Sequence, residues 1–279
     1  MNFTKYHGAG NDFIVIDART IDMDWPGLAR DMCVRHFGVG ADGIILVADH
    51  GCEPLMRMFN PDGSEAEACG NGLRCFVKHV VDTGLVDKDI FAVQTLGGPR
   101  QVVAFRSPDG TVDEVELSMG VPRFTPHEIP AIVPGHPGPL VDIPIQVSGH
   151  TLRANLVSMG NPHAVLFLDT EPHAYPLGTI GPLLERHEMF PSRVNFEIAQ
   201  VRGRTEIDAR VWERGAGETL ACGTGACAIV VAGIIQGVCD NVVNVHLPGG
   251  ELTITWPGGQ EEVKLRGPVV RVFTGNWPD

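Results

Sequence analysis

The stretch Ala68-Cys69-Gly70-Asn71-Gly72 decides the fold, because it recurs later as Ala221-Cys222-Gly223-Thr224-Gly225. In both places a cysteine opens a glycine-rich turn that leads directly into an apolar run with helical spacing. The approach to each cysteine also repeats, as Arg-Met-Phe-Asn at 57–60 and as Arg-Val-Trp-Glu at 210–213. Both offsets are the same, since 222 − 69 and 210 − 57 give 153. We therefore expect a pseudo-twofold chain that presents one thiol from each half to a shared cleft.

A further echo lies upstream of each cysteine. Gly10-Asn11 precedes the apolar run 13–16, and Gly160-Asn161 precedes the apolar run 164–168, at an offset of 150 residues. A period this long exceeds the roughly 20 to 50 residues of solenoid repeats, so it indicates a duplicated domain.

Composition limits the classes of function. The chain has 279 residues, of which 43% are apolar, which is enough for two domains that each have a core. The net charge is −13 and Lys and Arg do not cluster, so we expect no nucleic acid and no anionic membrane as a partner. The N-terminus lacks the basic-then-apolar layout of a secretory signal, and the longest apolar run, 226–235, is too short for a membrane span. We expect a soluble cytoplasmic protein.

Cysteine usage points to thiols in a reducing compartment. The seven cysteines are odd in number and irregular in spacing, which argues against a disulfide framework. No Cys-x-x-Cys pair occurs, so the sequence predicts no zinc site and no other metal. Five of the seven are interpreted as small packing residues: Cys33, Cys52, Cys75, Cys227 and Cys239.

The periodicity predicts many more strands than helices, in an α+β order without regular βαβ alternation. Helices are expected from Asp24, as N-cap, to Phe37, from Gly70 to Gly84, over 182–187 and over 226–235; the last is apolar on every face and should be surrounded by strands. Prolines crowd between 122 and 144, so this segment should be neither a helix nor an interior strand, and we interpret it as the crossover between the halves. Strands are expected over 13–17, 44–47, 55–59, 90–95, 102–105, 112–118, 143–147, 152–158, 164–168, 196–201, 207–212, 242–247, 252–256, 263–265 and 269–273.

Two thiols at helix starts indicate acid–base chemistry. A helix N-terminus stabilises an anion, but by at most about 2 kcal/mol, and an ordinary thiol of pKa about 8.5 is only about 3% thiolate at pH 7. A neighbouring base is therefore needed, and His163 and Glu213 are the best candidates. If one thiol is ionised and the other protonated, one can take a proton from a carbon while the other delivers one to the opposite face. That reaction inverts a stereocentre.

The ordered set of motifs resembles diaminopimelate epimerase over nearly the whole chain. These motifs are Lys5-Tyr6-His7-Gly8-Ala9-Gly10-Asn11-Asp12-Phe13, Phe59-Asn60-Pro61-Asp62-Gly63-Ser64, Ala68-Cys69-Gly70-Asn71-Gly72, Gly160-Asn161-Pro162-His163, Trp212-Glu213-Arg214-Gly215 and Ala221-Cys222-Gly223-Thr224-Gly225-Ala226. The resemblance implies a cofactor-independent isomerase that interconverts LL- and meso-2,6-diaminoheptanedioate in lysine biosynthesis, and a homodimer. It also implies two pseudo-symmetric domains, each a mixed β-barrel-like sheet wrapped around a central helix, with the active site in the cleft between them. The N-terminal domain would comprise 1–118 plus 267–279 and carry Cys69; the C-terminal domain would comprise 119–266 and carry Cys222.

The resemblance also assigns roles. Cys69 and Cys222 would be proton donor and acceptor, with His163 and Glu213 adjusting their protonation. The reacting carboxylate would be held by Gly70, Asn71, Gly223 and Thr224, and the distal end of the substrate by Asn11, Asn60, Asn161, Asn195 and Arg214, with Glu213 also at the substrate. Some members of the family contact substrate through a side chain at the position of Gly43, where this chain has none.

Two alternatives remain open on the sequence. Proline and hydroxyproline racemases have paired cysteines too, but typically show Cys-Gly-His-Gly at the first, where this chain has Asn71. A non-enzymatic binding protein, or a thiol redox protein that uses Cys69 and Cys222 as a pair, is the second class. Protection of the thiols by substrate, and a direct assay of stereoisomer interconversion, would separate these hypotheses.

Overall fold

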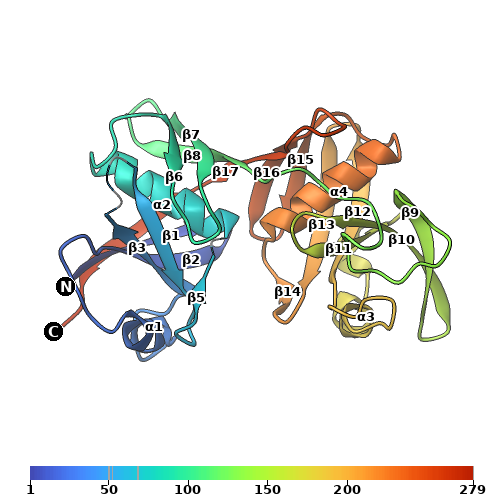
Figure 1. The fold of residues 1–279 in the computed structure, drawn as a ribbon, viewed down its shortest axis with the longest axis horizontal. Coiled ribbons are helices and arrows are strands. Elements are labelled where there is room, and N and C mark those ends of the chain that lie inside the picture. Colours follow the sequence, from blue (N-terminus) through green and yellow to red (C-terminus); the bar gives the residue numbers. More distant parts are fainter. Residues whose placement is uncertain (50, 52, 68, 279) are drawn as a thin grey trace. The chain divides into compact units, whose positions relative to one another are not determined.

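The computed structural model describes residues 1–49, 51, 53–67 and 69–278. The chain divides into two compact units, Met1–Ser118 with Arg266–Asp279, and Met119–Leu265. Figure 1 labels most elements of both units. Cys52, interpreted from the sequence as a packing thiol, and Ala68, the first residue of the repeated stretch, lie outside the described residues.

The first unit is built on a mixed sheet. Its strand order is β18-β1-β2-β3-β4-β5, formed by Val270–Asn276, Asn2–Gly8, Asn11–Asp17, Gly43–Ala48, Leu55–Phe59 and Glu65–Ala66. β1 and β2 are antiparallel, β2 and β3 parallel, and β3 and β4 antiparallel. Three further antiparallel strands follow, β6 (Ile90–Val93), β7 (Arg100–Arg106) and β8 (Val112–Ser118). A parallel bridge joins Gln94, directly after β6, to Leu55 of β4.

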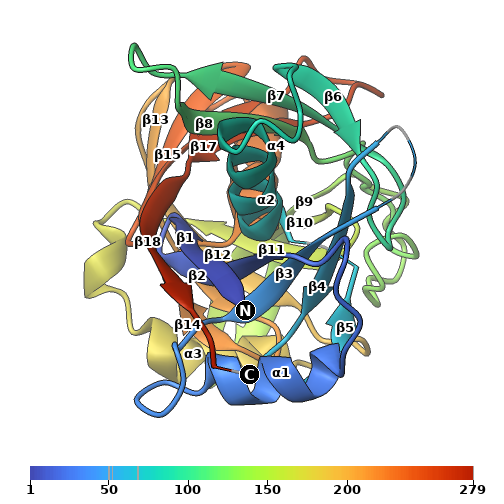
Figure 2. The same cartoon turned by 90° about the vertical axis from the view of Figure 1, so that its left-hand side faces the viewer.

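Helix α2 (Gly70–Asp82) is the centre of the first unit. It contacts β1, β2, β3, β4, β7 and β8, and Figure 2 shows strands around it. Its apolar positions are buried because strands cover it on several sides. The shorter α1 (Trp25–Cys33) packs on the opposite face of the sheet against Ile14, Ile16, Ile44 and Leu46.

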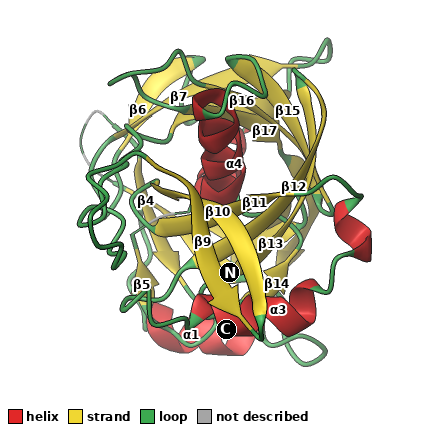
Figure 3. Cartoon of the chain, turned by 90° about the vertical axis from the view of Figure 1, so that its right-hand side faces the viewer, coloured by secondary structure: helices red, strands yellow, loops and turns green. Residues whose placement is uncertain are grey.

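The second unit repeats this plan. Its strand order is β16-β15-β13-β12-β11-β10-β9, with β14 (Gly217–Thr219) paired to β13. The strands span Gly250–Thr255, Val242–Leu247, Glu206–Glu213, Asn195–Gly203, Pro162–Phe167, His150–Ser158 and Leu140–Val147. Helix α4 (Gly223–Ile235) contacts β10, β11, β12, β15 and β16, and Figure 3 shows it among these strands. β17 (Lys264–Pro268) spans the return of the chain to the first unit.

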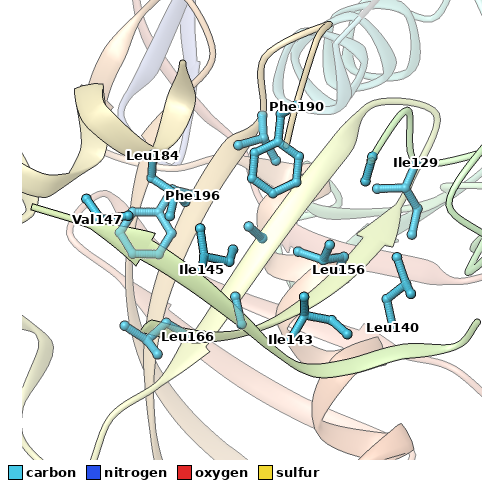
Figure 4. Packing of buried hydrophobic residues seen from close by; sticks show 14 of the residues in the cluster. Ile129, Leu140, Ile143, Ile145, Val147, Leu156, Leu166, Leu184, Phe190 and Phe196 are labelled. Carbon is cyan, nitrogen blue, oxygen red and sulfur yellow. The ribbon is translucent and has the colours of Figure 1, made fainter. Parts of the chain in front are cut away.

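The outer face of this second sheet carries its own core. α3 (Leu177–Glu185), preceded by a 3-10 turn at Pro172–Ala174, places Leu177 and Leu184 in a cluster with Phe196 and Ile198 of β12, shown in part in Figure 4. Alternate residues of a strand face opposite sides of its sheet. Glu197, between Phe196 and Ile198, therefore faces the side of α4.

The two units share one topology, which confirms the predicted pseudo-symmetry. β1-β2-α1-β3-β4-β5 of the first corresponds to β10-β11-α3-β12-β13-β14 of the second, each with a parallel pair joined through the short helix. The central helices α2 and α4 each contain 13 residues and begin 153 positions apart. The strand orders of the described residues form open paths rather than closed barrels.

Several expected boundaries were wrong, among them those of α1, α3 and β9. α1 ends at Cys33 rather than Phe37, and Phe37 is 92% exposed, because the chain turns extended at Val34. α3 begins at Leu177, five residues before the expected start, and tolerates Pro182 inside it. β9 begins at Leu140 inside the proline-rich segment; it includes Pro144 and lies at the end of the strand order, where a missing N–H is tolerated. Among the described residues, no helix has the length and apolar character needed to cross a membrane.

Candidate active site

Cys69 is the N-cap of α2. Its backbone is extended, with φ −118° and ψ 152°, and its Sγ accepts a hydrogen bond from the Gly72 backbone N–H at 3.2 Å. A sulfur in this position takes the place of the Ser or Asp oxygen that normally satisfies an unpaired N–H in the first turn. The helix start thus holds the thiol at the positive end of its dipole.

Cys222 is held in the same way at the start of α4. Its φ is −119° and ψ 116°, and its Sγ accepts from the Gly225 N–H at 3.3 Å. Both glycines lie in tight space: a Cβ on Gly72 would lie 3.1 Å from the Cys69 sulfur, and one on Gly225 would lie 3.0 Å from Glu197 Oε1. The repeated sequence therefore builds the same thiol cap twice.

Side-chain amides surround Cys69. Its Sγ lies 4.0 Å from Asn11 Oδ1, and Asn71 donates to the same oxygen at 3.3 Å. Asn11 donates in turn to Asp42 Oδ2 at 2.6 Å, and that oxygen also accepts from the Asp12 backbone N–H at 3.0 Å. The structure thus brings together three predicted site residues, Cys69, Asn71 and Asn11, and adds Asp42 as the residue that orients Asn11.

A charged cluster supports Asp42. Asp12 forms ion pairs with Lys5 at 2.7 Å and Arg35 at 2.7 Å, and Arg35 also binds Asp42 at 2.8 Å. Burial alone would raise the pKa of Asp12, but the hydrogen bonds from Arg35 and Lys5 outweigh it and lower that pKa to about 2. Asp12 is therefore ionised throughout the neutral range and anchors the turn that carries Asn11.

Arg74 is a buried cation on the helix that Cys69 caps. Its side chain is fully buried, its Nε donates to the Pro268 carbonyl at 3.1 Å, and its Nη1 and Nη2 have no hydrogen-bond partner within the described part of the chain. Burial lowers its pKa, while charge interactions with Cys75 and Cys69 act in the opposite direction. Cys69 therefore has a positive charge in its surroundings.

The surroundings of Cys222 are acidic instead. Cys222 is 6% exposed, and burial together with the charges of Glu213 and Glu197 raises its pKa well above the ordinary value, despite hydrogen bonds from Thr224 and Gly225. This arrangement keeps the Cys222 thiol protonated at neutral pH. The two caps share one backbone geometry but differ in the charges around them.

A chain of hydrogen bonds leads away from Cys222. Thr224 Oγ1 lies 3.4 Å from its sulfur, and Asn161 Nδ2 donates to Thr224 Oγ1 at 3.3 Å. Asn161 Oδ1 lies 2.9 Å from His163 Nε2, and His163 Nδ1 lies 2.7 Å from Glu197 Oε1. His163 therefore reaches Cys222 through Asn161 and Thr224.

Asn195 and Arg214 meet at the end of β13. Asn195 donates to the Pro162 carbonyl at 2.9 Å and accepts from the Arg214 backbone N–H at 2.9 Å, while the Arg214 guanidinium donates to the Ser192 carbonyl at 3.1 Å. Beside them, Glu213 accepts a hydrogen bond from Thr219. This half of the predicted site is gathered in the second unit.

Asn60 and Gly43 stand apart from these contacts. Asn60 lies in the predicted turn, where its side chain donates to Ser64 Oγ at 3.0 Å. A Cβ on Gly43 would lie 2.7 Å from the Phe59 carbonyl oxygen, so a side chain does not fit there without a backbone shift. The side-chain contact that the family resemblance implied for this position is therefore closed to this chain.

Sequence reasoning missed Asp42, Arg74 and Glu197. Arg74 and Glu197 left a signal, since each is a charged residue inside a run whose other members are apolar and buried. Asp42 gave no such signal, because an aspartate next to Gly43 is typical of an ordinary turn. Within the described ranges, no group of three or more His, Cys, Asp and Glu side chains is arranged to hold a metal ion.

Comparison with known proteins gives matches along the whole chain. The family model described as "Diaminopimelate epimerase" matches residues 3–125 and 155–272. The chain is similar to the diaminopimelate epimerase of Moorella thermoacetica, at 48% identity over 284 residues that cover 100% of this chain and 99% of the relative. It is equally similar to that of Pelotomaculum thermopropionicum, at 48% identity over 282 residues with 100% and 99% coverage.

Solved structures share the fold at low identity. A hydroxyproline epimerase from Agrobacterium vitis superimposes with a TM-score of 0.68 at 18% identity, covering 99% of this chain and 91% of its own. A PhzF-family phenazine biosynthesis protein from Bacillus anthracis gives 0.68 at 16% identity, covering 99% and 98%. At these identities the likeness concerns the fold alone.

Proposed function

This chain belongs to the diaminopimelate epimerase family, and from that premise we propose that it interconverts LL- and meso-2,6-diaminoheptanedioate by passing a proton across one α-carbon between two thiols. Family membership makes it an isomerase. The observation that carries the two-thiol mechanism is the duplicated cap, in which Cys69 and Cys222 each accept a backbone N–H at 3.2 and 3.3 Å in the first turn of a buried helix.

We infer the starting roles of the two thiols from the charges around them. Because burial and two carboxylates raise the pKa of Cys222, Cys222 enters the reaction as the acid. Cys69, next to the cation Arg74, then enters as the thiolate base. The base removes the α-hydrogen as a proton and becomes a thiol, while Cys222 delivers its proton to the opposite face and becomes a thiolate. One C–H bond breaks and one forms, so no oxidant and no cofactor is needed.

The remaining predicted residues would hold the substrate. The N–H groups at the starts of α2 and α4, from Gly70, Asn71, Gly223 and Thr224, would bind the carboxylate next to the reacting carbon and stabilise the charge that develops on it. The distal carboxylate and amine need a fork of donors and acceptors. We assign that role to Asn11, Asn60, Asn161, Asn195, Glu213 and Arg214.

The test is exchange of the substrate's α-hydrogen with solvent. Purified protein incubated with LL-2,6-diaminoheptanedioate in D2O, without pyridoxal phosphate or metal, should incorporate deuterium at one α-carbon and form the meso isomer. Exchange that depends on an added metal or on pyridoxal phosphate would overturn the cofactor-free mechanism.

Cysteine variants test the two-thiol scheme directly. Cys69→Ala and Cys222→Ala should each abolish epimerisation, whereas Cys239→Ala, at a buried thiol that donates to the Val230 carbonyl, should keep it. Near-normal turnover in either of the first two variants would refute the scheme.

We also propose, on the strength of the family resemblance, that the two compact units are independent domains, that the protein is a homodimer and that it works in the cytoplasm. Light scattering on the purified protein tests the dimer, and a monomeric mass would refute it.

A further inference from the structure

We propose that Glu185 is a positioning residue: it binds the turn 214–216 to the end of helix α3 and so fixes Arg214 where the guanidinium binds the distal carboxylate of the substrate. The proposal rests on the proposed function, which it deepens by assigning a residue that sets the affinity for the distal end. Glu185 was not among the predicted site residues, and its side chain accepts hydrogen bonds from residues beside the proposed substrate groups rather than from those groups.

Both oxygens of the Glu185 carboxylate accept a donor from the hairpin formed by β13 and β14. Trp212 Nε1 donates to Oε2 at 2.9 Å, and the Gly215 backbone N–H donates to Oε1 at 3.1 Å. Arg193 Nη1 lies 3.5 Å from the same Oε1. Glu185 is 3% exposed, so these contacts replace water around its carboxylate. Burial would raise the pKa of Glu185, but these hydrogen bonds and the charges of Arg186 and Arg193 lower it overall, so the group is ionised at neutral pH.

Trp212 joins α3 to the hairpin. A Cβ on Gly181 would lie 2.5 Å from Trp212 Cδ2, so a glycine is needed for the helix to approach this ring so closely. Gly181 and Glu185 are four residues apart and therefore lie on one face of α3. That face meets both the ring of Trp212 and its N–H, which places the Glu185 carboxylate beside the turn that follows β13.

Arg214 is held by the two segments that Glu185 binds. One is the turn itself, because Gly215, whose N–H the Glu185 carboxylate accepts, directly follows Arg214. The other is the segment before β12. There the Glu185 backbone carbonyl accepts from the Val194 N–H at 3.2 Å. The Arg214 guanidinium donates to the Ser192 carbonyl of the same segment at 3.1 Å. A shift of Glu185 therefore moves the supports of the guanidinium on both sides.

The first unit shows that the fold does not need an acid at this place. The short helices α1 and α3 each contain nine residues, and 177 − 25 gives an offset of 152 that aligns their last residues, Cys33 and Glu185. In both units the carbonyl of that last residue accepts a backbone N–H of the following loop at 3.2 Å, from Ala41 and from Val194. Cys33 is also 3% exposed. The same packing position thus carries a small thiol in one unit and a carboxylate in the other.

The end of a helix does not favour a carboxylate by itself. A negative charge in the last turn meets the negative end of the helix dipole, which lowers stability rather than raising it. Burial of a carboxylate adds a desolvation cost, and apolar residues of similar size often satisfy the packing equally well. Helix and core therefore leave this acid unexplained, whereas its hydrogen bonds to the hairpin account for it.

The two units also differ in how the turn after the corresponding strand is held. In the first unit the turn at 60–64 supplies its own acceptor, since Asp62 Oδ1 takes the Ser64 N–H at 2.8 Å. In the second unit the turn gives the Gly215 N–H to Glu185, a residue of another element. The position of Arg214 therefore depends on α3.

Glutamine cannot reproduce these contacts, although its shape is the same. Its amide has one oxygen that accepts and one NH2 group that only donates. In the place of Oε1 the NH2 group would face the Gly215 N–H, and in the place of Oε2 it would face the Trp212 indole N–H. In either orientation a donor opposes a donor, so one of the two contacts is lost.

The experiment is a double-substitution cycle between Glu185 and Arg214, read as a dissociation constant. Calorimetric titration with an equilibrated mixture of LL- and meso-2,6-diaminoheptanedioate measures binding without net reaction. We expect Glu185→Gln to raise the dissociation constant about tenfold, because the guanidinium loses its place. Turnover of bound substrate should fall by less than about twofold, since the distal contact is the same in the ground and transition states.

The second arm of the cycle asks whether Glu185 acts through Arg214. Arg214→Ala should weaken binding by itself. Adding Glu185→Gln to Arg214→Ala should then change the dissociation constant by less than about twofold, since the group that Glu185 positions is gone.

Other results would overturn the proposal. A merely structural role lowers the melting temperature of Glu185→Gln and leaves its dissociation constant unchanged. An effect of Glu185→Gln that is as large with Arg214→Ala as without it shows that Glu185 does not act through this guanidinium. Should Glu185→Gln fail to fold, Trp212→Phe removes the indole donor while keeping a ring at Gly181, and the same lack of additivity with Arg214→Ala is expected.

A matched control comes from Glu218 in the same hairpin. It pairs with Trp212 across β13 and β14, but its carboxylate binds the Arg210 side chain at 2.7 Å rather than the turn. Glu218→Gln should leave the dissociation constant unchanged, and a rise as large as that of Glu185→Gln would show that any charge lost from the hairpin weakens binding. If the unsubstituted protein does not bind diaminoheptanedioate, the proposed function fails together with this role. If it binds and Glu185→Gln binds equally well, the positioning role alone fails.

Discussion

Replacing Gly72 with alanine should damage the chemistry while sparing the fold. The new Cβ would lie 3.1 Å from the Cys69 sulfur and 3.2 Å from Ile45 Cδ1, whereas ordinary contact begins near 3.4 Å, so the sulfur must retreat by about 0.3 Å. That movement weakens the hydrogen bond from the Gly72 N–H to the sulfur, now 3.2 Å. A hydrogen bond to a charged group contributes about 1.5–3 kcal/mol. Losing roughly half of it, about 0.75–1.5 kcal/mol, reduces kcat about fourfold to thirteenfold.

Stability moves little in the same variant, because two effects oppose each other. Alanine in place of a helical glycine gains about 0.5–1 kcal/mol, and the tight contact costs a similar amount. Gly178→Ala in α3 is the matched control, since its Cβ would meet nothing within 4 Å and its position is far along the chain from both thiols. Deuterium exchange and thermal unfolding should be measured on both variants. A Gly72→Ala protein that keeps its full rate, or a Gly178→Ala protein that loses as much, would refute the reasoning.

Three further substitutions probe the supports of the site. Asp42→Asn removes the carboxylate that accepts from Asn11 at 2.6 Å, so we expect KM to rise about tenfold in steady-state assays with little change in melting temperature. Asp12→Asn should lower the free energy of unfolding at pH 7 by about 2 kcal/mol, because folding depresses the pKa of Asp12 to about 2. In denaturant titrations this difference should be present above about pH 4 and vanish toward pH 2. Glu185→Gln removes the negative charge that accepts a hydrogen bond from the Gly215 backbone N–H, in the loop that carries Arg214. KM should therefore rise more than kcat falls in steady-state assays, and an unchanged KM would show that this loop does not set substrate affinity.

Much of the fold could be predicted from local patterns. The strands over 112–118 and 242–247 were predicted to the residue, because turn residues bound them on both sides. The central position of α4 followed from its apolar character on every face. The ends of elements were less predictable. α1 ends at Cys33 because the backbone becomes extended at Val34, and no glycine or proline at that point predicts the change.

The site was predictable where the chemistry is carried by a repeated motif. Both thiols lie at the helix starts that their glycine-rich turns indicated. What periodicity could not supply is which side chains from distant strands stand behind each thiol. The partner of His163 is Glu197, and 34 residues and a short helix separate them along the chain. Only the parallel pairing of β11 and β12 brings them together.

The two halves share a backbone plan but differ in the charges around their thiols. An epimerase that worked with two identical thiols in identical surroundings would have no preferred resting state, because either sulfur could carry the proton. Here the two units share one backbone plan but carry different charges near their thiols. Asn60 in the first unit corresponds to Glu213 in the second, 153 positions later, and Ile45 corresponds to Glu197. Both substitutions add a carboxylate on the side of Cys222 and none on the side of Cys69. Duplication thus supplies the same thiol cap twice, and differences in a few side chains give the two caps different charges.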